Sequence, residues 1–236
     1  MKWWLCLLVV FIPNAFANTP RFAANQMQSN SSVEPFKHNR LIVGITGASG
    51  VVYGVRALEM LAQSGIESHL VMSKAAEMTI RYETDYRPAD VKALAHQVYP
   101  IGDVGASISS GSYRTLGMLI APCSVRTMSE IASGVTSSLL TRAADVVLKE
   151  QRRLVLMVRE APLHAGHLKS MLDLAQMGAV ITPPVPAFYT KPKSIEDIVD
   201  QTVSRALDLF NIDVPDIRRW GEDIGENPSA RRSKDE

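Results

Sequence analysis

The chain has 236 residues, of which 46% are hydrophobic and 21% charged, as is usual for a globular protein with a substantial core. Its formal net charge is +1, so no overall field attracts nucleic acid, and we expect no such partner. The two cysteines, Cys6 and Cys123, are far apart in the sequence and exclude a disulfide framework.

The first residues have the pattern of a secretory signal. Met1-Lys2 precede a short apolar stretch, and Ala15-Phe16-Ala17 has the A-x-A form of a cleavage site. The apolar stretch is short for a membrane span. The alternative is an upstream start codon, which would add residues outside the working protein. We expect a leader and disordered linker over 1–39, a single domain over 40–220 and a mobile tail over 221–236.

Short apolar runs alternate with amphipathic stretches of helical length, which predicts buried parallel strands that alternate with helices. In the first half we expect, in chain order, a strand at 40–45, a helix at 51–64, a strand at 67–72, helices at 75–82 and 87–97, and a strand at 116–121. In the second half we expect helices at 124–133 and 138–151, a strand at 154–158, a helix at 164–177, a strand at 179–182 and a helix at 194–212. Residues 103–112 are expected to form a loop with exposed backbone donors. This order predicts an α/β fold, a doubly wound parallel sheet in a three-layer, Rossmann-like or flavodoxin-like sandwich.

Three of the apolar runs stop at small polar clusters. The first runs into Gly47-Ala48-Ser49-Gly50, the second into Ser124-Val125-Arg126-Thr127 and the third into Arg159-Glu160. In open α/β sheets the ligand binds outside the carboxyl ends of the strands. Glycines, hydroxyls and backbone N–H groups at helix N-termini bind anions. We therefore expect a site for an anionic ligand at this edge of the sheet.

The glycine loop favours a mononucleotide over a dinucleotide. Its spacing from Gly44 is G-x-x-G-x-x-G, and Ser73 stands where a dinucleotide site has an acidic residue for the ribose. A tight turn without a ligand is the alternative. Ser124 alone is most simply a helix N-cap, but two such clusters at neighbouring strand ends favour a ligand.

Three cations on the predicted helices are candidates for binding a phosphate. Arg142 and Lys149 share one helical stripe, although Asp145 is within reach of both and would equally form a solvated salt-bridge patch. Arg205 is expected on the inward-looking side of the last helix. Because a buried arginine needs a partner, we expect an anion beside it. A snorkelling arginine at the edge of the sheet is the alternative.

Two further side chains lie near the predicted site. Glu160 follows a strand directly, and its place in the crevice favours proton transfer over a purely structural ion pair. Tyr189 follows a proline-rich loop and either packs in the core or belongs to a lid over the ligand.

His164 and His167 are three residues apart, a spacing that fits a metal site on a helix. No third ligand is near in the sequence, so we favour a solvent-facing pair at the helix start and expect no metal.

These motifs together strongly resemble the flavin prenyltransferase family, UbiX. The likeness runs in the family's order from about residue 40 to 220. It is carried by ITGASG at 45–50, LVMSK at 70–74, ETD at 83–85, APCS at 121–124, RAADVVLKE at 142–150, VREAPLH at 158–164 and PAFY at 186–189. The R-A-A-D-V-x-L-K-E and R-E-x-P-L motifs are specific, whereas many folds share the glycine loop.

The resemblance implies a homo-oligomer, dodecameric in this family, that binds reduced FMN and dimethylallyl phosphate between subunits. It implies transfer of the dimethylallyl group to N5 and C6 of the flavin without a metal ion. The prenylated FMN would serve a UbiD-type decarboxylase, as in ubiquinone synthesis. The family works in the cytoplasm, to which the signal-like residues 1–17 are foreign.

The resemblance also assigns roles to single residues. The expected FMN contacts are Gly47, Ala48, Ser49, Ser73, Ser124, Val125, Arg126, Thr127 and Arg159. The expected contacts to the prenyl phosphate are Arg142, Lys149, Tyr189 and Arg205. The residues expected to assist the chemistry are Ser49, Glu83, Lys149 and Glu160. One departure is Val104, because some members carry an aromatic residue there.

Two other functions fit the same fold. An FMN-dependent cysteine decarboxylase relies on a catalytic histidine and an asparagine-containing motif, whereas residues 121–127 contain no asparagine. A non-catalytic flavin-binding regulatory subunit would not need Lys149 or Glu160 for its function.

Overall fold

The protein is described by a computed structural model that covers residues 39–214, 218–221 and 224. All described residues belong to one compact unit within residues 36–236. The predicted leader and linker up to residue 38, and most of the predicted tail, lie outside the described residues.

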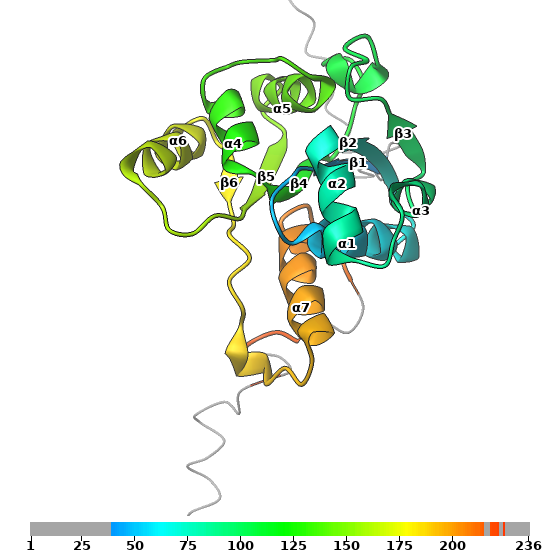
Figure 1. Ribbon diagram of the computed structural model, residues 1–236, viewed down its shortest axis with the longest axis vertical. Coiled ribbons are helices and arrows are strands. Elements are labelled where there is room, and N and C mark those ends of the chain that lie inside the picture. Colours follow the sequence, from blue (N-terminus) through cyan, green and yellow to red (C-terminus); the bar gives the residue numbers. More distant parts are fainter. Residues whose placement is uncertain (1–38, 215–217, 222–223, 225–236) are drawn as a thin grey trace, which may run out of the picture. The chain divides into compact units, whose positions relative to one another are not determined.

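The described part contains six parallel strands in one sheet (Figure 1). The strands are β1 (Arg40–Ile45), β2 (Glu67–Met72), β3 (Gln97–Tyr99), β4 (Gly117–Cys123), β5 (Arg153–Val158) and β6 (Val180–Ile181). Their order in the sheet is β3-β2-β1-β4-β5-β6, the order of the doubly wound Rossmann sheet. The predicted fold class is confirmed.

Helices connect the strands and cover both faces of the sheet. The helices are α1 (Val51–Gln63), α2 (Lys74–Glu83), α3 (Pro88–Ala93), α4 (Val125–Ala132), α5 (Leu139–Lys149), α6 (Ala165–Gln176) and α7 (Ile195–Asp208), with short 3₁₀ turns η1 (Ser107–Ser109) and η2 (Phe188–Thr190). None of the described helices is long and apolar enough to cross a membrane.

Successive side chains of a strand face opposite sides of the sheet, so each strand contributes to two cores. In β1, Leu41 and Val43 pack with α1 and α7, whereas Ile42 between them packs with α4, α5 and α6. Figure 1 shows α7 beside α1. Both cores consist of side chains that are almost entirely buried. Because both faces of each strand are covered, the strand sequences are continuous apolar runs.

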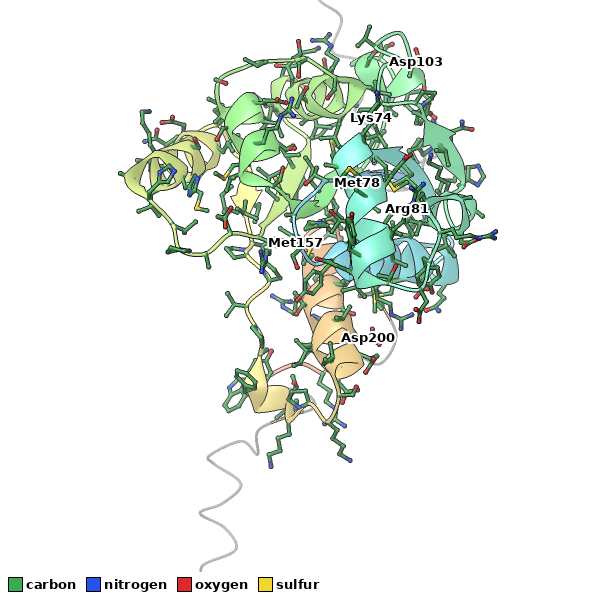
Figure 2. All side chains as sticks on the ribbon, in the orientation of Figure 1. Lys74, Met78, Arg81, Asp103, Met157 and Asp200 are labelled. Atoms are coloured by element: carbon green, nitrogen blue, oxygen red, sulfur yellow. The ribbon has the colours of Figure 1, made fainter. Side chains whose placement is uncertain are left out.

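Two close contacts fix α1 against its neighbours. A Cβ added to Gly54 would lie 2.3 Å from the Ala121 carbonyl oxygen, so only glycine lets α1 approach the sheet this closely. On the other side of α1, Arg56 donates to both carboxylate oxygens of Asp200 on α7, at 2.7 and 3.0 Å. Asp200 is labelled in Figure 2. The start of α1, which carries the glycine loop, is therefore held in place.

Most predicted elements are confirmed to within two residues, but two predicted helices extend too far. The helix expected over 87–97 ends at Ala93, and β3 follows; an edge strand of three residues is too short to show a period of its own. The last helix ends at Asp208, before Asn211 adopts a positive φ of 57°. Residues 103–112 form a loop, as expected; it contains η1, buries Ile108 and uses some of its backbone donors in its own turns.

Candidate active site

Main-chain hydrogen bonds bring the carboxyl ends of four strands together. The Ser73 N–H, after β2, donates to the Ile45 carbonyl of β1 at 3.0 Å. The Arg159 N–H, after β5, donates to the Cys123 carbonyl of β4 at 3.1 Å. The three polar clusters expected from the sequence therefore lie along one edge of the sheet.

Thr46 joins the glycine loop to the Ser124 loop. The residue is 1% exposed. The Oγ1 hydroxyl donates to the Pro122 carbonyl at 2.7 Å and accepts from the Ser124 N–H at 2.8 Å. No sequence pattern assigns Thr46 a role of its own; the available signal is a hydroxyl at the end of a buried strand, directly before Gly47. Thr46 sets the spacing between the two loops that would face a ligand.

The start of α1 already holds a carboxylate. The N–H groups of Gly50 and Val51 donate to Glu83 Oε2 at 2.7 and 3.2 Å. Glu83 ends α2 and reaches across to α1, where a negative charge is favourable because of the helix dipole. A ligand phosphate at these two donors would have to displace Glu83. The resemblance identified Glu83 as a site residue, but only the structure shows this contact.

The starts of α2 and α4 are capped by their serines. Ser73 Oγ accepts from the Ala76 N–H at 3.1 Å, and Ser124 Oγ accepts from the Thr127 N–H at 3.3 Å. The N-cap interpretation of Ser124 is therefore confirmed, and a ligand contact through its other groups stays a prediction. The first turn of α4 contains no acidic residue, so its positive end is available to an anion.

Cations flank this edge of the sheet. Lys74 opens α2 (Figure 2). The side chain of Arg126, on α4, is 85% exposed and pairs with Glu130 at 3.0 Å.

Arg159 lies close enough to the start of α1 to affect Tyr53. Burial raises the pKa of Tyr53, and the positive charge of Arg159 opposes that rise. The Tyr53 ring lies against the glycine loop, since a Cβ on Gly50 would be 2.9 Å from its Cε2 atom. The side chain of Glu160, the residue after Arg159, folds back onto the main chain, where its Oε1 accepts from the Ala161 N–H at 3.0 Å.

Cys123 is unsuited to nucleophilic chemistry. It ends β4 and is fully buried. Burial raises its pKa to about 12, so the thiol stays protonated at neutral pH.

Lys149 lies at the opposite edge of the sheet from the glycine loop. It ends α5, four residues before Arg153 begins β5, and Arg153 pairs with Gly117 at the start of β4. A six-residue strand spans about 20 Å, so the length of β5 separates Lys149 from the carboxyl edge of the sheet within one chain. The Lys149 ammonium pairs with Glu150 at 2.5 Å.

The salt-bridge patch considered for α5 forms in part. Arg142 pairs with Asp145 at 2.8 Å, as expected for a solvated patch. Lys149 does not join it.

Arg205 is not on the inward-looking side of α7, so that expectation is wrong. Its side chain is 54% exposed and pairs with Asp208, which also binds Arg219 at 2.8 Å. The stripe that faces the core includes Val199 and Val203 and lies one residue further along the helix. The expected anion beside Arg205 is present, but it belongs to the same helix.

Tyr189 also stands apart from the glycine loop within one chain. It lies in η2, and its ring packs edge-on against Trp220, with 5.6 Å between the ring centroids. Of the predicted residues, those of the strand-end loops and Glu83 come together, whereas Lys149, Tyr189 and Arg205 do not join them within a single chain.

The two histidines form a stacked pair at the start of α6, where His164 is exposed, as expected, and His167 is half-buried. Their ring centroids are 3.6 Å apart. His164 caps α6 by accepting from the Gly166 N–H at 3.1 Å, and Nδ1 of His167 is buried. Within the described residues, no three His, Cys, Asp or Glu side chains are grouped as metal ligands.

Comparison with known proteins identifies the family. The Flavoprotein family model matches residues 29–207. The flavin prenyltransferase UbiX of Escherichia coli strain K12 is 57% identical over 184 residues, which cover 77% of this chain and 97% of the relative. This chain belongs to the flavin prenyltransferase family, UbiX.

Solved structures agree with the sequence. AnUbiX (PadA1), solved in complex with FMN and dimethylallyl pyrophosphate, superimposes with a TM-score of 0.78 and 51% identity, over 81% of this chain and all of the other. A dodecameric FMN-dependent UbiX-like decarboxylase from Escherichia coli O157:H7 gives a TM-score of 0.75 and 50% identity, over 77% and 98% of the two chains. The resemblance read from the motifs is confirmed.

Proposed function

We propose that this chain joins the dimethylallyl group of dimethylallyl phosphate to N5 and C6 of reduced FMN. The observation that carries the proposal is the gathering of the glycine loop, Ser73, Ser124–Thr127 and Arg159 at one sheet edge in a member of this family. The product would serve a UbiD-type decarboxylase, with ubiquinone synthesis as the pathway. Residues 40–220 are proposed as the working domain, acting in the cytoplasm.

The strand-end loops are suited to holding FMN. The phosphate fits the start of α4 best, because α4 has no acidic residue in its first turn, whereas the first turn of α2 contains Glu77 and Glu83 already occupies the start of α1. The proposed FMN contacts are Gly47, Ala48, Ser49, Ser73, Ser124, Val125, Arg126, Thr127 and Arg159. Reduced FMN supplies the nitrogen and carbon atoms that receive the dimethylallyl group.

We propose that neighbouring subunits supply the phosphate-binding residues. Lys149, Tyr189 and Arg205 lie apart from the glycine loop within one chain, so the full set of Arg142, Lys149, Tyr189 and Arg205 would act across subunit interfaces. Breaking the allylic C–O bond leaves its electron pair on the phosphate. Cations held beside the leaving group stabilise that developing charge without a metal ion.

Proton transfer completes the reaction. The bond to N5 replaces the N5 proton, and the bond to C6 would consume the remaining C=C of the dimethylallyl group, which gains one proton while C6 loses one. Glu160 or the departing phosphate would accept the proton that C6 loses. Ser49 directly precedes Gly50, whose N–H donates to Glu83, and Ser49 and Glu83 are the other groups proposed to move protons.

Substitution of Lys149 and Glu160 separates this function from the alternatives. We expect Lys149→Ala and Glu160→Gln to keep FMN binding within about twofold and to lower prenyl transfer at least about a hundredfold, because each acts on the reacting groups. Flavin fluorescence measures the binding, and mass spectrometry of the flavin measures the transfer. As a control, Asp173→Asn on α6 should change neither. Full function in both variants would favour a non-catalytic flavin-binding subunit.

A cysteine decarboxylase is the other alternative. The strand-end stretch 121–127 contains no asparagine, which counts against it. Release of carbon dioxide from a peptide with a C-terminal cysteine would support that activity and contradict the proposal.

A further inference from the structure

The end of α5 is clamped to the loop that begins near Asp103, which is labelled in Figure 2. The guanidinium of Arg152 donates to the Gly111 carbonyl at 2.6 Å and to the Tyr113 carbonyl at 2.8 Å. Arg152 is three residues beyond the last residue of α5, so these two bonds tie the loop to the turn in which α5 ends. The loop and the turn form one unit.

Glu150 and Lys149 rest on the main chain of that loop. A Cβ on Gly111 would lie 2.1 Å from Glu150 Oε1 and 2.9 Å from Lys149 Nζ. Any side chain at position 111 would push both groups away. Because the displaced atoms are the ends of flexible side chains, this would cost little stability while moving the ion pair.

The pairing of Lys149 with Glu150 depends on the local geometry. Adjacent residues inside a helix do not face each other. Here Glu150 is the C-cap, just past the last helical residue, and its Oε1 accepts from the Lys149 ammonium at 2.5 Å. Its Oε2 is 4.0 Å from Arg152. The Lys149 ammonium lowers the pKa of Glu150, so the carboxylate stays charged near neutral pH.

We propose that Glu150 is a positioning residue, which together with the bare main chain of Gly111 holds the Lys149 ammonium for the prenyl phosphate. The inference rests on the proposed function, in which Lys149 binds that phosphate. An ammonium has three N–H donors, so one bond to Glu150 leaves two for a phosphate. A free lysine side chain would lose many rotamers on binding the substrate, and a held side chain loses fewer.

The first test measures the ion pair itself and does not need turnover. The whole protein is treated briefly with acetic anhydride, and acetylation of each lysine is followed by mass spectrometry of its peptides. We expect Lys149 to react at least about threefold faster in Glu150→Gln and in Gly111→Ala than in the wild type, because an ion-paired amine reacts slowly. Gly102→Ala, where an added Cβ meets nothing within 4 Å, is the matched control. Equal rates in all four proteins would overturn the proposal.

The second test separates positioning from a purely structural role. We expect Glu150→Gln and Gly111→Ala to raise KM for dimethylallyl phosphate about five- to tenfold, with kcat and FMN affinity changed less than about twofold. In a Lys149→Gln background the change at position 150 should add nothing, because the two residues act as one unit. An unchanged KM, or a full effect in that background, would contradict the proposal. Absence of prenylated flavin from the wild type would instead overturn the proposed function.

Discussion

Glu83 determines the chemical character of the glycine loop. Without its carboxylate, the N–H groups of Gly50 and Val51 would be free donors at a helix start, a common place for a phosphate. With it, both donors are satisfied from α2, and the positive end of α1 is partly neutralised. The loop therefore presents mainly its glycines and Ser49 to a ligand, which suits contact with a flat ring better than contact with a phosphate.

The stability contributed by this contact can be measured. We expect Glu83→Ala to lower the free energy of unfolding by about 1 kcal/mol, the usual effect of losing a helix cap, and Glu83→Gln to lower it less because the amide oxygen still accepts. Urea unfolding at a fixed protomer concentration is the measurement. Glu196→Ala, in the first turn of α7, should stay within about 0.5 kcal/mol of the wild type. Equal stability of Glu83→Ala and the wild type would show that the carboxylate does not cap α1.

At the level of elements, the sequence predicts what depends on local pattern. Most strands and helices follow from apolar runs and helical spacing, and the strand-end clusters follow from them. Thr46 contacts residues that are 76 and 78 positions away in the sequence, and Glu83 contacts residues 32 and 33 positions away. No local sequence pattern predicts contacts over such separations. Ile198 and Leu209 share a helical stripe with Arg205, and this apolar pattern predicts an inward-looking side chain, whereas the neighbouring stripe with Val199 and Val203 is the buried one.

The packing of α1 on the sheet depends on Gly54. Alanine is the better helix former by about 1 kcal/mol, so local preference alone would favour Gly54→Ala. We expect the contact with the Ala121 carbonyl to outweigh that gain and the substitution to lower the free energy of unfolding by about 2 kcal/mol.

Urea unfolding of Gly54→Ala beside Gly102→Ala checks this expectation. Gly102 has open space around it and should tolerate alanine within about 0.5 kcal/mol. A Gly54→Ala protein as stable as the wild type would mean that α1 can shift away from the sheet without loss.

At the scale of the whole molecule, one chain presents the residues proposed to bind FMN and those proposed to bind the prenyl phosphate at separate places. The loops around Arg159 lie at the carboxyl edge of the sheet, and Lys149 lies at the other edge. Copies of the chain in an oligomer would bring the two sets together. This arrangement predicts that sites are shared between subunits.

Mixed oligomers test that prediction. Oligomers of Arg159→Ala alone and of Lys149→Ala alone should both be inactive. When the two chains are co-expressed with different affinity tags and purified through both, about a quarter of the wild-type activity should return, because random mixing pairs one intact Arg159 with one intact Lys149 at that frequency. Mixed oligomers without activity would show that each site is built within one chain.

The most direct measurement is the mass of the flavin after turnover. The protein is incubated without oxygen with reduced FMN and dimethylallyl phosphate, and the flavin is extracted and weighed by mass spectrometry. We predict a flavin heavier by five carbons and eight hydrogens, with release of one inorganic phosphate for each, and no such product when dimethylallyl phosphate is left out. Flavin of unchanged mass after incubation with equimolar protein would contradict prenyl transfer by this chain.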